Sequence, residues 1–193
     1  MLTFDEIFGE ARIMAILRGL PPDETVALAE RLWDAGVTVL EVPLASPHGL
    51  DALRATAVAA TARNRTIGAG TVLTPDQVRA AADAGARYTV APGLDLTVLA
   101  AALHAGLPHL PGVATATEVA TATAAGCRWL KAFPAGALGP GWISALRGPF
   151  PDVRFVATGG LSATDVPTFL AAGASVVALG SALGDPAALA NWL

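Results

Sequence analysis

The chain has 193 residues and a formal net charge of −4 at pH 7, and this length suits one large domain with a sizeable core. Although 53% of the residues are apolar, much of that share is alanine, and Gly, Pro, Thr or a charge interrupts every stretch long enough to span a membrane. The start has neither the basic nor the apolar segment of a secretion signal, so we expect a cytoplasmic protein without a membrane partner. No basic stripe could follow a phosphate backbone, so we expect no nucleic-acid partner.

The residues that most often bind metals are few and scattered. Cys127 is the single cysteine and has no Cys or His at metal-ligand spacing beside it. His48, His104 and His109 form no HxH or HExxH pair. We therefore expect no metal site and a buried structural role for Cys127.

Short apolar runs alternate along the chain with alanine-rich stretches of helical length, and Gly, Pro or Asp marks the joints. We expect eight strands, at residues 13–17, 37–42, 66–69, 87–91, 108–110, 128–132, 154–157 and 175–179. The expected helices lie at residues 23–35, 47–62, 75–84, 96–105, 117–125, 140–146 and 164–171, with a short last helix at 186–193. Thr74 before Pro75, and Thr115 three residues before Glu118, are typical helix starts.

Several expected helices end in an Ala-Gly pair before the next strand, at Gly36, Gly85, Gly126 and Gly173. Strands alternating with helices in this way predict an α/β protein with a (β/α)8 TIM barrel, in a single domain covering residues 1–193. A doubly wound open sheet is the alternative, but it should show GxGxxG after its first strand, and the residues after 17 lack this motif. Because the last helix is so short, we expect an incomplete outer wall near the C-terminus.

Lys131 is the only lysine of the chain, and it lies in the apolar run from Arg128 to Pro134. Every other Lys or Arg position is arginine, so the chain has kept a single amine, inside an expected strand. Arginine stays protonated and cannot add to a carbonyl, whereas a desolvated lysine can lose its proton and form a Schiff base. The sequence therefore predicts that Lys131 forms an imine.

The alternation of side chains along a strand predicts where Lys131 and Glu41 point. Leu40 and Val42 share the face that packs against helices, so Glu41 should point to the barrel axis. Leu130 should likewise pack against helices, so its neighbour Lys131 should point inward. This direction also avoids an unpaired charge between sheet and helix. Lys131 as nucleophile and Glu41 as acid and base would then meet in one cavity. A buried salt bridge between the two is the alternative.

Glycine-rich segments follow the last two expected strands, where barrels often bind phosphate through backbone N–H groups. The first segment contains Gly159 and Gly160, and the second contains Gly180 and Ser181. Arg18, after the first expected strand, is suited to hold a carboxylate with two hydrogen bonds, and the Thr71 hydroxyl could donate to the same group. These residues predict a substrate with a phosphate at one end and a carboxylate at the other.

The motifs that carry these residues resemble the class I 2-keto-3-deoxy-6-phosphogluconate aldolases, and most closely the branch that cleaves 2-keto-3-deoxy-6-phosphogalactonate. The resemblance runs in order from about residue 12 to residue 182. It rests on the segments at 15–19 (AILRG), 40–47 (LEVPLASP), 68–73 (GAGTVL), 111–118 (PGVATATE), 130–134 (LKAFP) and 158–160 (TGG).

The resemblance implies a (β/α)8 lyase of carbohydrate metabolism, in an Entner-Doudoroff type pathway, that is usually a homotrimer and needs no metal or other cofactor. It implies that Lys131 forms the Schiff base and that Glu41 is the general acid and base. The products would be pyruvate and glyceraldehyde 3-phosphate. The resemblance also assigns the substrate contacts: Arg18 and Thr71 to the pyruvate carboxylate, Pro92 and Phe133 to the pyruvate pocket, and Gly159, Gly160, Gly180 and Ser181 to the phosphate.

The sequence departs from both branches of this family beside the expected site. Ala45 stands where the gluconate branch often has Arg and the galactonate branch Asn, so the sequence does not assign the sugar epimer. Gly136 and Ala137 stand where the galactonate branch tends to carry small hydroxylated residues.

Two other functions are compatible with these residues. One is a phosphate-binding barrel that isomerises or cyclises a sugar phosphate without an imine. The other is a non-catalytic sugar-acid sensor, although a binding protein has no need of the amine. Activity on 2-keto-4-hydroxyglutarate is left open.

Overall fold

The computed structural model describes residues 2–180, and its strands form one sheet in which each pair of neighbours is parallel. The sheet has nine strands, in the spatial order β5-β4-β3-β2-β1-β9-β8-β7-β6. They are β1 (Ile13–Ile16), β2 (Val39–Pro43), β3 (Gly68–Gly70), β4 (Tyr88–Val90), β5 (His109–Leu110), β6 (Gly112–Val113), β7 (Trp129–Ala132), β8 (Arg154–Thr158) and β9 (Val176–Leu179).

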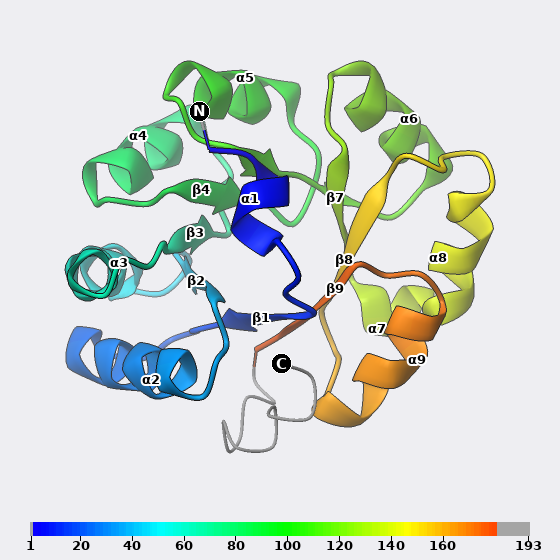
Figure 1. Cartoon of the computed structure of the whole chain (residues 1–193). Helices are drawn as coiled ribbons and strands as arrows, with labels where there is room; N and C mark the ends of the chain where they lie inside the picture. Colours follow the sequence, from blue (N-terminus) through cyan, green and yellow to red (C-terminus); the bar gives the residue numbers. More distant parts are fainter. Residues whose placement is uncertain (1, 181–193) are drawn as a thin grey trace.

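Pro111 explains why the sheet has nine strands where the sequence predicts eight. The expected strand at 108–110 is followed directly by a second short strand, and only Pro111, which lacks an N–H group, separates β5 from β6. On one side this segment pairs with β4, and on the other side the Lys131 N–H donates to the Pro111 carbonyl at 2.9 Å. The two ends of the strand order are therefore neighbours in the chain, and the sheet curls into a nearly closed barrel (Figure 1).

Helices surround this barrel, and their ends follow the capping signals of the sequence. They are α1 (Phe4–Phe8), α2 (Pro22–Asp34), α3 (Gly49–Ala62), α4 (Pro75–Asp83), α5 (Leu96–His104), α6 (Ala116–Ala124), α7 (Ala135–Leu138), α8 (Pro140–Arg147) and α9 (Val166–Ala171), with a 3-10 turn at Ala163–Asp165. Thr74 caps α4 and Thr115 forms a capping box with Glu118, as predicted. The four glycines expected at helix ends have φ values between 91° and 101°, a region that favours glycine (Gly36, Gly85, Gly126 and Gly173).

The alternation of side chains along the strands separates two buried layers. One layer lies between the sheet and the helices and contains Leu40, Leu130 and Ala132. The other fills the barrel interior and contains Val39 and Trp129 from the same strands. Glu41 and Lys131 each lie next to a residue of the layer between sheet and helices, so their side chains point inward, as predicted.

Helix α1 closes the end of the barrel where the strands begin, and the sequence analysis did not predict it. Its Phe8 ring stacks on Trp129 with 4.5 Å between ring centres, and its Asp5 carboxylate accepts a hydrogen bond from the Trp129 indole at 2.9 Å. The capping box from Thr3 to Glu6 is the local signal that was missed. Figure 1 shows α1 lying across the near end of the ring of strands. Substrate therefore has to reach the interior from the opposite end.

Two expectations about helices need correction, and those for the residues after 180 are not tested. Helix α7 was not predicted, and α3 begins at Gly49 rather than at residue 47. The expected helix at 186–193 and the incomplete wall near it lie outside the described residues, as does Ser181.

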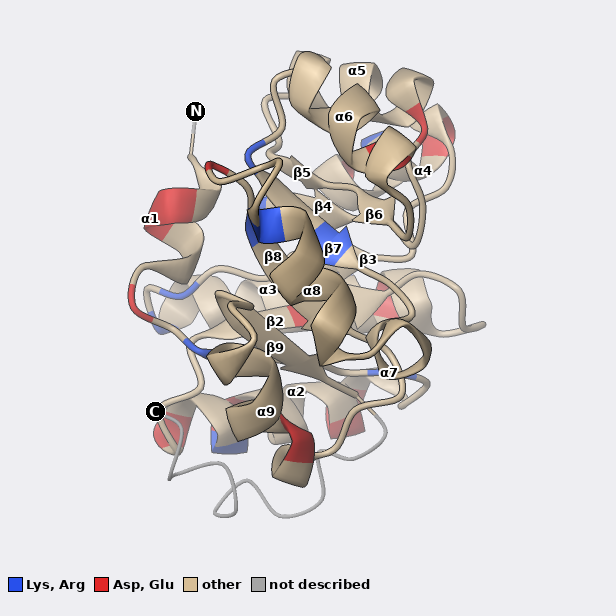
Figure 2. Ribbon diagram, turned by 90° about the vertical axis from the view of Figure 1, so that its right-hand side faces the viewer, with Lys and Arg blue, Asp and Glu red and all other residues tan. Residues whose placement is uncertain are grey.

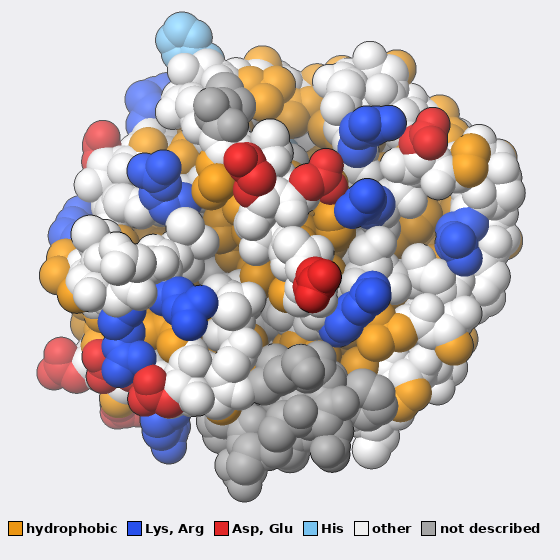
Figure 3. All heavy atoms as spheres, viewed as in Figure 1, with side chains coloured by type: hydrophobic (Ala, Val, Ile, Leu, Met, Phe, Trp, Pro, Cys, Tyr) orange, Lys and Arg blue, Asp and Glu red, His pale blue; other side chains and the backbone are white. Residues whose placement is uncertain are grey.

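None of the helices in residues 2–180 is long and apolar enough to cross a membrane. On the face that carries α1, acidic and basic side chains are interspersed (Figure 3).

Candidate active site

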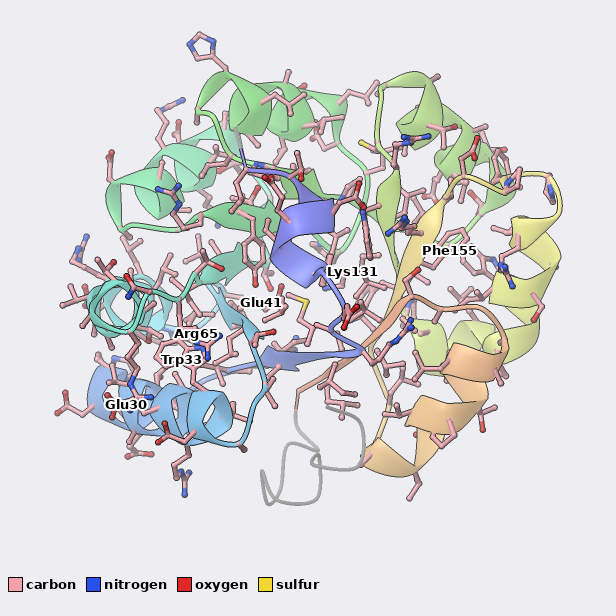
Figure 4. All side chains as sticks on the ribbon, viewed as in Figure 1. Glu30, Trp33, Glu41, Arg65, Lys131 and Phe155 are labelled. Carbon is pink, nitrogen blue, oxygen red and sulfur yellow. The ribbon has the colours of Figure 1, made fainter. Side chains whose placement is uncertain are left out.

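The carboxyl half of the barrel interior holds the two charged residues that the sequence placed there. Lys131 comes from β7 and Glu41 from β2, and their side chains are only 5% and 2% exposed. Figure 4 shows both side chains projecting into the ring of strands, and Figure 2 shows β7, which carries a blue segment, in the middle of the barrel. Both side chains therefore point into the barrel interior, as predicted.

The Lys131 amine lies in surroundings that disfavour its charge. Burial lowers the pKa of Lys131, and the positive charge of Arg18 lowers it further, whereas the Glu41 carboxylate raises it. The nitrogen Nζ is 5.0 Å from the centre of the Phe133 ring. Because burial is the largest of these effects, more of the amine is neutral, and able to attack a carbonyl, than in an exposed lysine.

The Glu41 carboxyl group is shifted in the complementary direction. Burial raises the pKa of Glu41, while the charges of Lys131 and Arg18 act against that rise. Its atom Oε2 is buried and has no hydrogen-bond donor among residues 2–180. A carboxyl group that holds its proton more readily and has a free oxygen is suited to exchange protons with a bound substrate.

Lys131 and Glu41 do not neutralise each other by direct contact. All ion pairs within 4 Å in the described part of the chain are formed by arginine, and their side chains are at least 38% exposed. The charge of each group shifts the pKa of the other, so they lie in the same region although no ion pair within 4 Å joins them. The buried salt bridge considered as the alternative from the sequence is therefore not formed among residues 2–180.

A cavity of about 470 Å³ opens at the carboxyl ends of the strands and unites most of the predicted substrate contacts. Its wall includes Arg18, Phe133, Gly159, Gly160 and Gly180. The Phe133 ring lies against Gly159, where an added Cβ atom would come within 2.8 Å of the ring. Phe133 therefore contacts the glycine-rich segment on one side and approaches the Lys131 amine on the other.

Thr71 and Pro92 follow β3 and β4 but do not line this cavity, and neither do Lys131 and Glu41. Thr71 adopts a left-handed backbone with φ of 57°, which is costly for a β-branched residue. Its neighbour Val72 donates a hydrogen bond to the Val90 carbonyl at 3.0 Å, so the turn is held to the next strand. Strained backbone of this kind often occurs at binding sites, where the surrounding structure maintains it.

The structure adds residues to the site that the sequence analysis did not select. These are the inward-facing Ile16 and Ala178, which line the cavity together with Gly136 and Ala137, the two residues that the sequence placed beside the expected site. The Gly136 N–H donates to the Gly159 carbonyl at 2.8 Å and so ties the segment after β7 to the segment after β8. No local pattern marks such contacts, because they depend on which strands are neighbours. Among residues 2–180, no three His, Cys, Asp or Glu side chains are grouped to hold a metal ion.

The chain matches the family model described as KDPG and KHG aldolase over residues 4–192. The chain is 41% identical over 178 residues to the probable 2-dehydro-3-deoxy-6-phosphogalactonate aldolase of Rhizobium meliloti, covering 92% of this chain and 84% of the relative. It is 40% identical over 168 residues to the 2-dehydro-3-deoxy-phosphogluconate aldolase of Pseudomonas aeruginosa, covering 86% and 76% of the two chains.

Solved structures of such aldolases have the same fold as this chain. A native KDPGal structure superposes with a TM-score of 0.84 and 38% identity, covering 93% of this chain and 89% of the other. The KDPG aldolase of Legionella pneumophila, with pyruvate captured as a covalent carbinolamine intermediate, superposes with a TM-score of 0.87 and 29% identity, covering 97% and 94%. The match over nearly the whole chain, in sequence and in fold, shows that this protein belongs to the KDPG and KHG aldolase family.

Proposed function

We propose that this protein is a class I aldolase that cleaves a 2-keto-3-deoxy-6-phospho sugar acid into pyruvate and glyceraldehyde 3-phosphate. The observation that carries the proposal is the buried Lys131 amine, whose pKa is lowered by burial, in a barrel interior shared with Glu41. An amine of this kind is the nucleophile that imine chemistry needs. The carbinolamine formed with pyruvate in the Legionella relative supports the same chemistry here.

The proposed reaction begins at the keto group of the substrate. The neutral Lys131 amine adds to C2, and the protonated Glu41 carboxyl group donates the proton with which water leaves, so that an iminium remains. Glu41 then takes the proton of the C4 hydroxyl, the C3–C4 bond breaks, and its electron pair moves into the iminium to form an enamine. Glyceraldehyde 3-phosphate leaves, the enamine takes a proton at C3, and water hydrolyses the imine to release pyruvate and the free amine.

The two ends of the substrate are assigned to different parts of the site. Arg18 and Thr71 would hold the carboxylate of the pyruvyl half, next to Pro92 and Phe133. The phosphate would lie at the backbone of Gly159, Gly160, Gly180 and Ser181, of which the first three line the cavity. Because a carboxylate and a phosphate are bound at fixed places, the C3–C4 bond would be held near both Lys131 and Glu41.

We further propose that the fold is a single-domain (β/α)8 barrel in which β5 and β6 count as one strand. The hydrogen bonds of this segment to both β4 and β7 support that interpretation. The enzyme would act in the cytoplasm as a homotrimer and use no cofactor other than the covalent imine at Lys131.

Borohydride reduction in the presence of pyruvate tests the function. An imine at Lys131 would be reduced to a stable secondary amine, and mass spectrometry of peptides would place the added mass on that residue. Absence of labelling, under conditions that label a known class I aldolase, would favour an isomerase or cyclase without an imine. Labelling without turnover of any phosphorylated sugar acid would instead indicate a sensor.

The sugar epimer needs a separate measurement. Cleavage rates for 2-keto-3-deoxy-6-phosphogalactonate and 2-keto-3-deoxy-6-phosphogluconate, measured with the same protein, would assign the preferred substrate.

A further inference from the structure

Strand β3 presents no side chain to the barrel interior. Its middle residue, Ala69, belongs to the layer between sheet and helices, so Gly68 and Gly70 face inward. The strand lies between β2 and β4. The space that two inward side chains would occupy is therefore open to residues of the neighbouring strands.

Tyr88, on β4, fills the first of these spaces. Its ring lies directly over Gly68, where any Cβ atom would overlap with the ring. Its hydroxyl donates a hydrogen bond across β3 to the carbonyl of Leu40 on β2, at 2.6 Å. The ring is therefore held at both ends and cannot move to make room for a larger residue at position 68.

Glu41, on β2, fills the second space from the other side. A Cβ atom at Gly70 would come within 2.8 Å of Oε1 and 2.9 Å of the carboxyl carbon of Glu41. Oε2 has no hydrogen-bond donor among residues 2–180, and the missing side chain of Gly70 leaves room for the carboxyl group. Tyr88 lies near the same carboxylate, because burial raises the pKa of Tyr88 and the charge of Glu41 raises it further.

We propose that Gly70 is a positioning residue for the reaction, because its missing side chain sets where the Glu41 carboxyl group lies relative to Lys131 and the substrate. The proposal rests on the proposed function, in which Glu41 transfers protons. The carboxyl group is the far end of a flexible side chain, so a methyl group at position 70 would displace it and leave the strand in place. A shift of about 1 Å in a catalytic group can lower a rate by about 10²-fold.

The variant Gly70→Ala tests this role, with Gly141→Ala as the matched control. A Cβ atom at Gly141 would meet nothing within 4 Å, and the residue lies on α8. We expect Gly70→Ala to lower kcat by about 10- to 100-fold. The final amount of imine trapped with saturating pyruvate should be unchanged, because Lys131 is untouched. Gly141→Ala should match the wild type in both measurements.

A crystal structure of Gly70→Ala provides a readout that does not depend on activity, and it should show the Glu41 carboxyl group displaced. A normal kcat, an unmoved carboxyl group, or a protein that no longer folds would each overturn the proposal. Gly68→Ala should instead lower the melting temperature, because the anchored Tyr88 ring cannot yield. If the wild type formed no imine, the proposed function would fall, while the crystal structure would still decide whether Gly70 places Glu41.

Discussion

The Lys131 amine lies 5.0 Å from the centre of the Phe133 ring. Phe133 follows Lys131 by two residues in the chain. The ring in turn lies against Gly159, in the glycine-rich segment after β8. An aromatic face stabilises an ammonium ion only modestly, and it supplies no hydrogen bond. The contact therefore helps to exclude water from the amine, in keeping with the lowered pKa of Lys131.

Replacement of the nucleophile should remove imine chemistry. In Lys131→Arg the buried positive charge is retained, but guanidinium cannot add to a carbonyl. We expect no label after borohydride reduction with pyruvate and a fall in kcat of at least about 10³-fold. Arg128→Lys is the control, because it places a lysine at an exposed position at the start of the same region and should not be labelled. Full turnover by Lys131→Arg would refute the aldolase mechanism.

The charges around Lys131 should shift the pH dependence of imine formation in opposite directions. Glu41 raises the pKa of Lys131, so Glu41→Gln should lower it and move the acid limb of the trapping rate to lower pH. Arg18 lowers the pKa of Lys131, so Arg18→Gln should move the same limb to higher pH. The trapping rate at saturating pyruvate, measured against pH, gives both shifts. Arg79→Gln, on the exposed surface of α4, should leave the profile unchanged, and shifts in one common direction would contradict this account.

The left-handed backbone at Thr71 should lower the stability of the fold, whereas its hydroxyl should strengthen substrate binding. Glycine adopts a φ of 57° without strain, so Thr71→Gly should raise the free energy of unfolding by about 1 kcal/mol. Loss of the hydroxyl should raise the KM for the substrate by about tenfold, since a hydrogen bond to a carboxylate is lost. Denaturant unfolding and steady-state kinetics test the two effects. Asn64 has a similar φ of 53°, but Asn tolerates it, so Asn64→Gly should gain less stability and keep its KM.

His109 should make the protein sensitive to acid although it takes no part in the proposed reaction. It is buried, its Nδ1 is 2.8 Å from the Thr89 hydroxyl, and burial lowers its pKa to about 4. The folded state therefore binds fewer protons than the unfolded state between about pH 6.5 and 4, so stability falls as the pH falls through this range.

The expected loss from His109 is about 3 kcal/mol in the free energy of unfolding over that range. His109→Asn keeps a polar atom near Thr89 but does not titrate, so its stability should change less between the two pH values. Urea unfolding at a series of pH values measures this difference. The exposed His104→Asn is the control and should follow the wild type, and equal acid sensitivity of His109→Asn would show that other groups cause it.

The sequence alone determined the features that depend on short stretches of chain. The period of two along a strand predicts that Lys131 and Glu41 point inward, and capping residues such as Thr74 and Thr115 mark where helices begin. The alternation of strands and helices predicts a parallel α/β sheet. These signals are local, because each needs only the few neighbouring residues that share one strand face or one helix turn.

Only the tertiary structure decided the contacts between segments that are distant along the chain. It shows that Pro111 divides a strand which still joins the two ends of the sheet, and that α1 closes the barrel through Phe8 and Trp129. It also places Gly70 beneath Glu41. Each of these depends on strand order and register, which arise from the packing of the whole sheet, so no short segment of the sequence carries them.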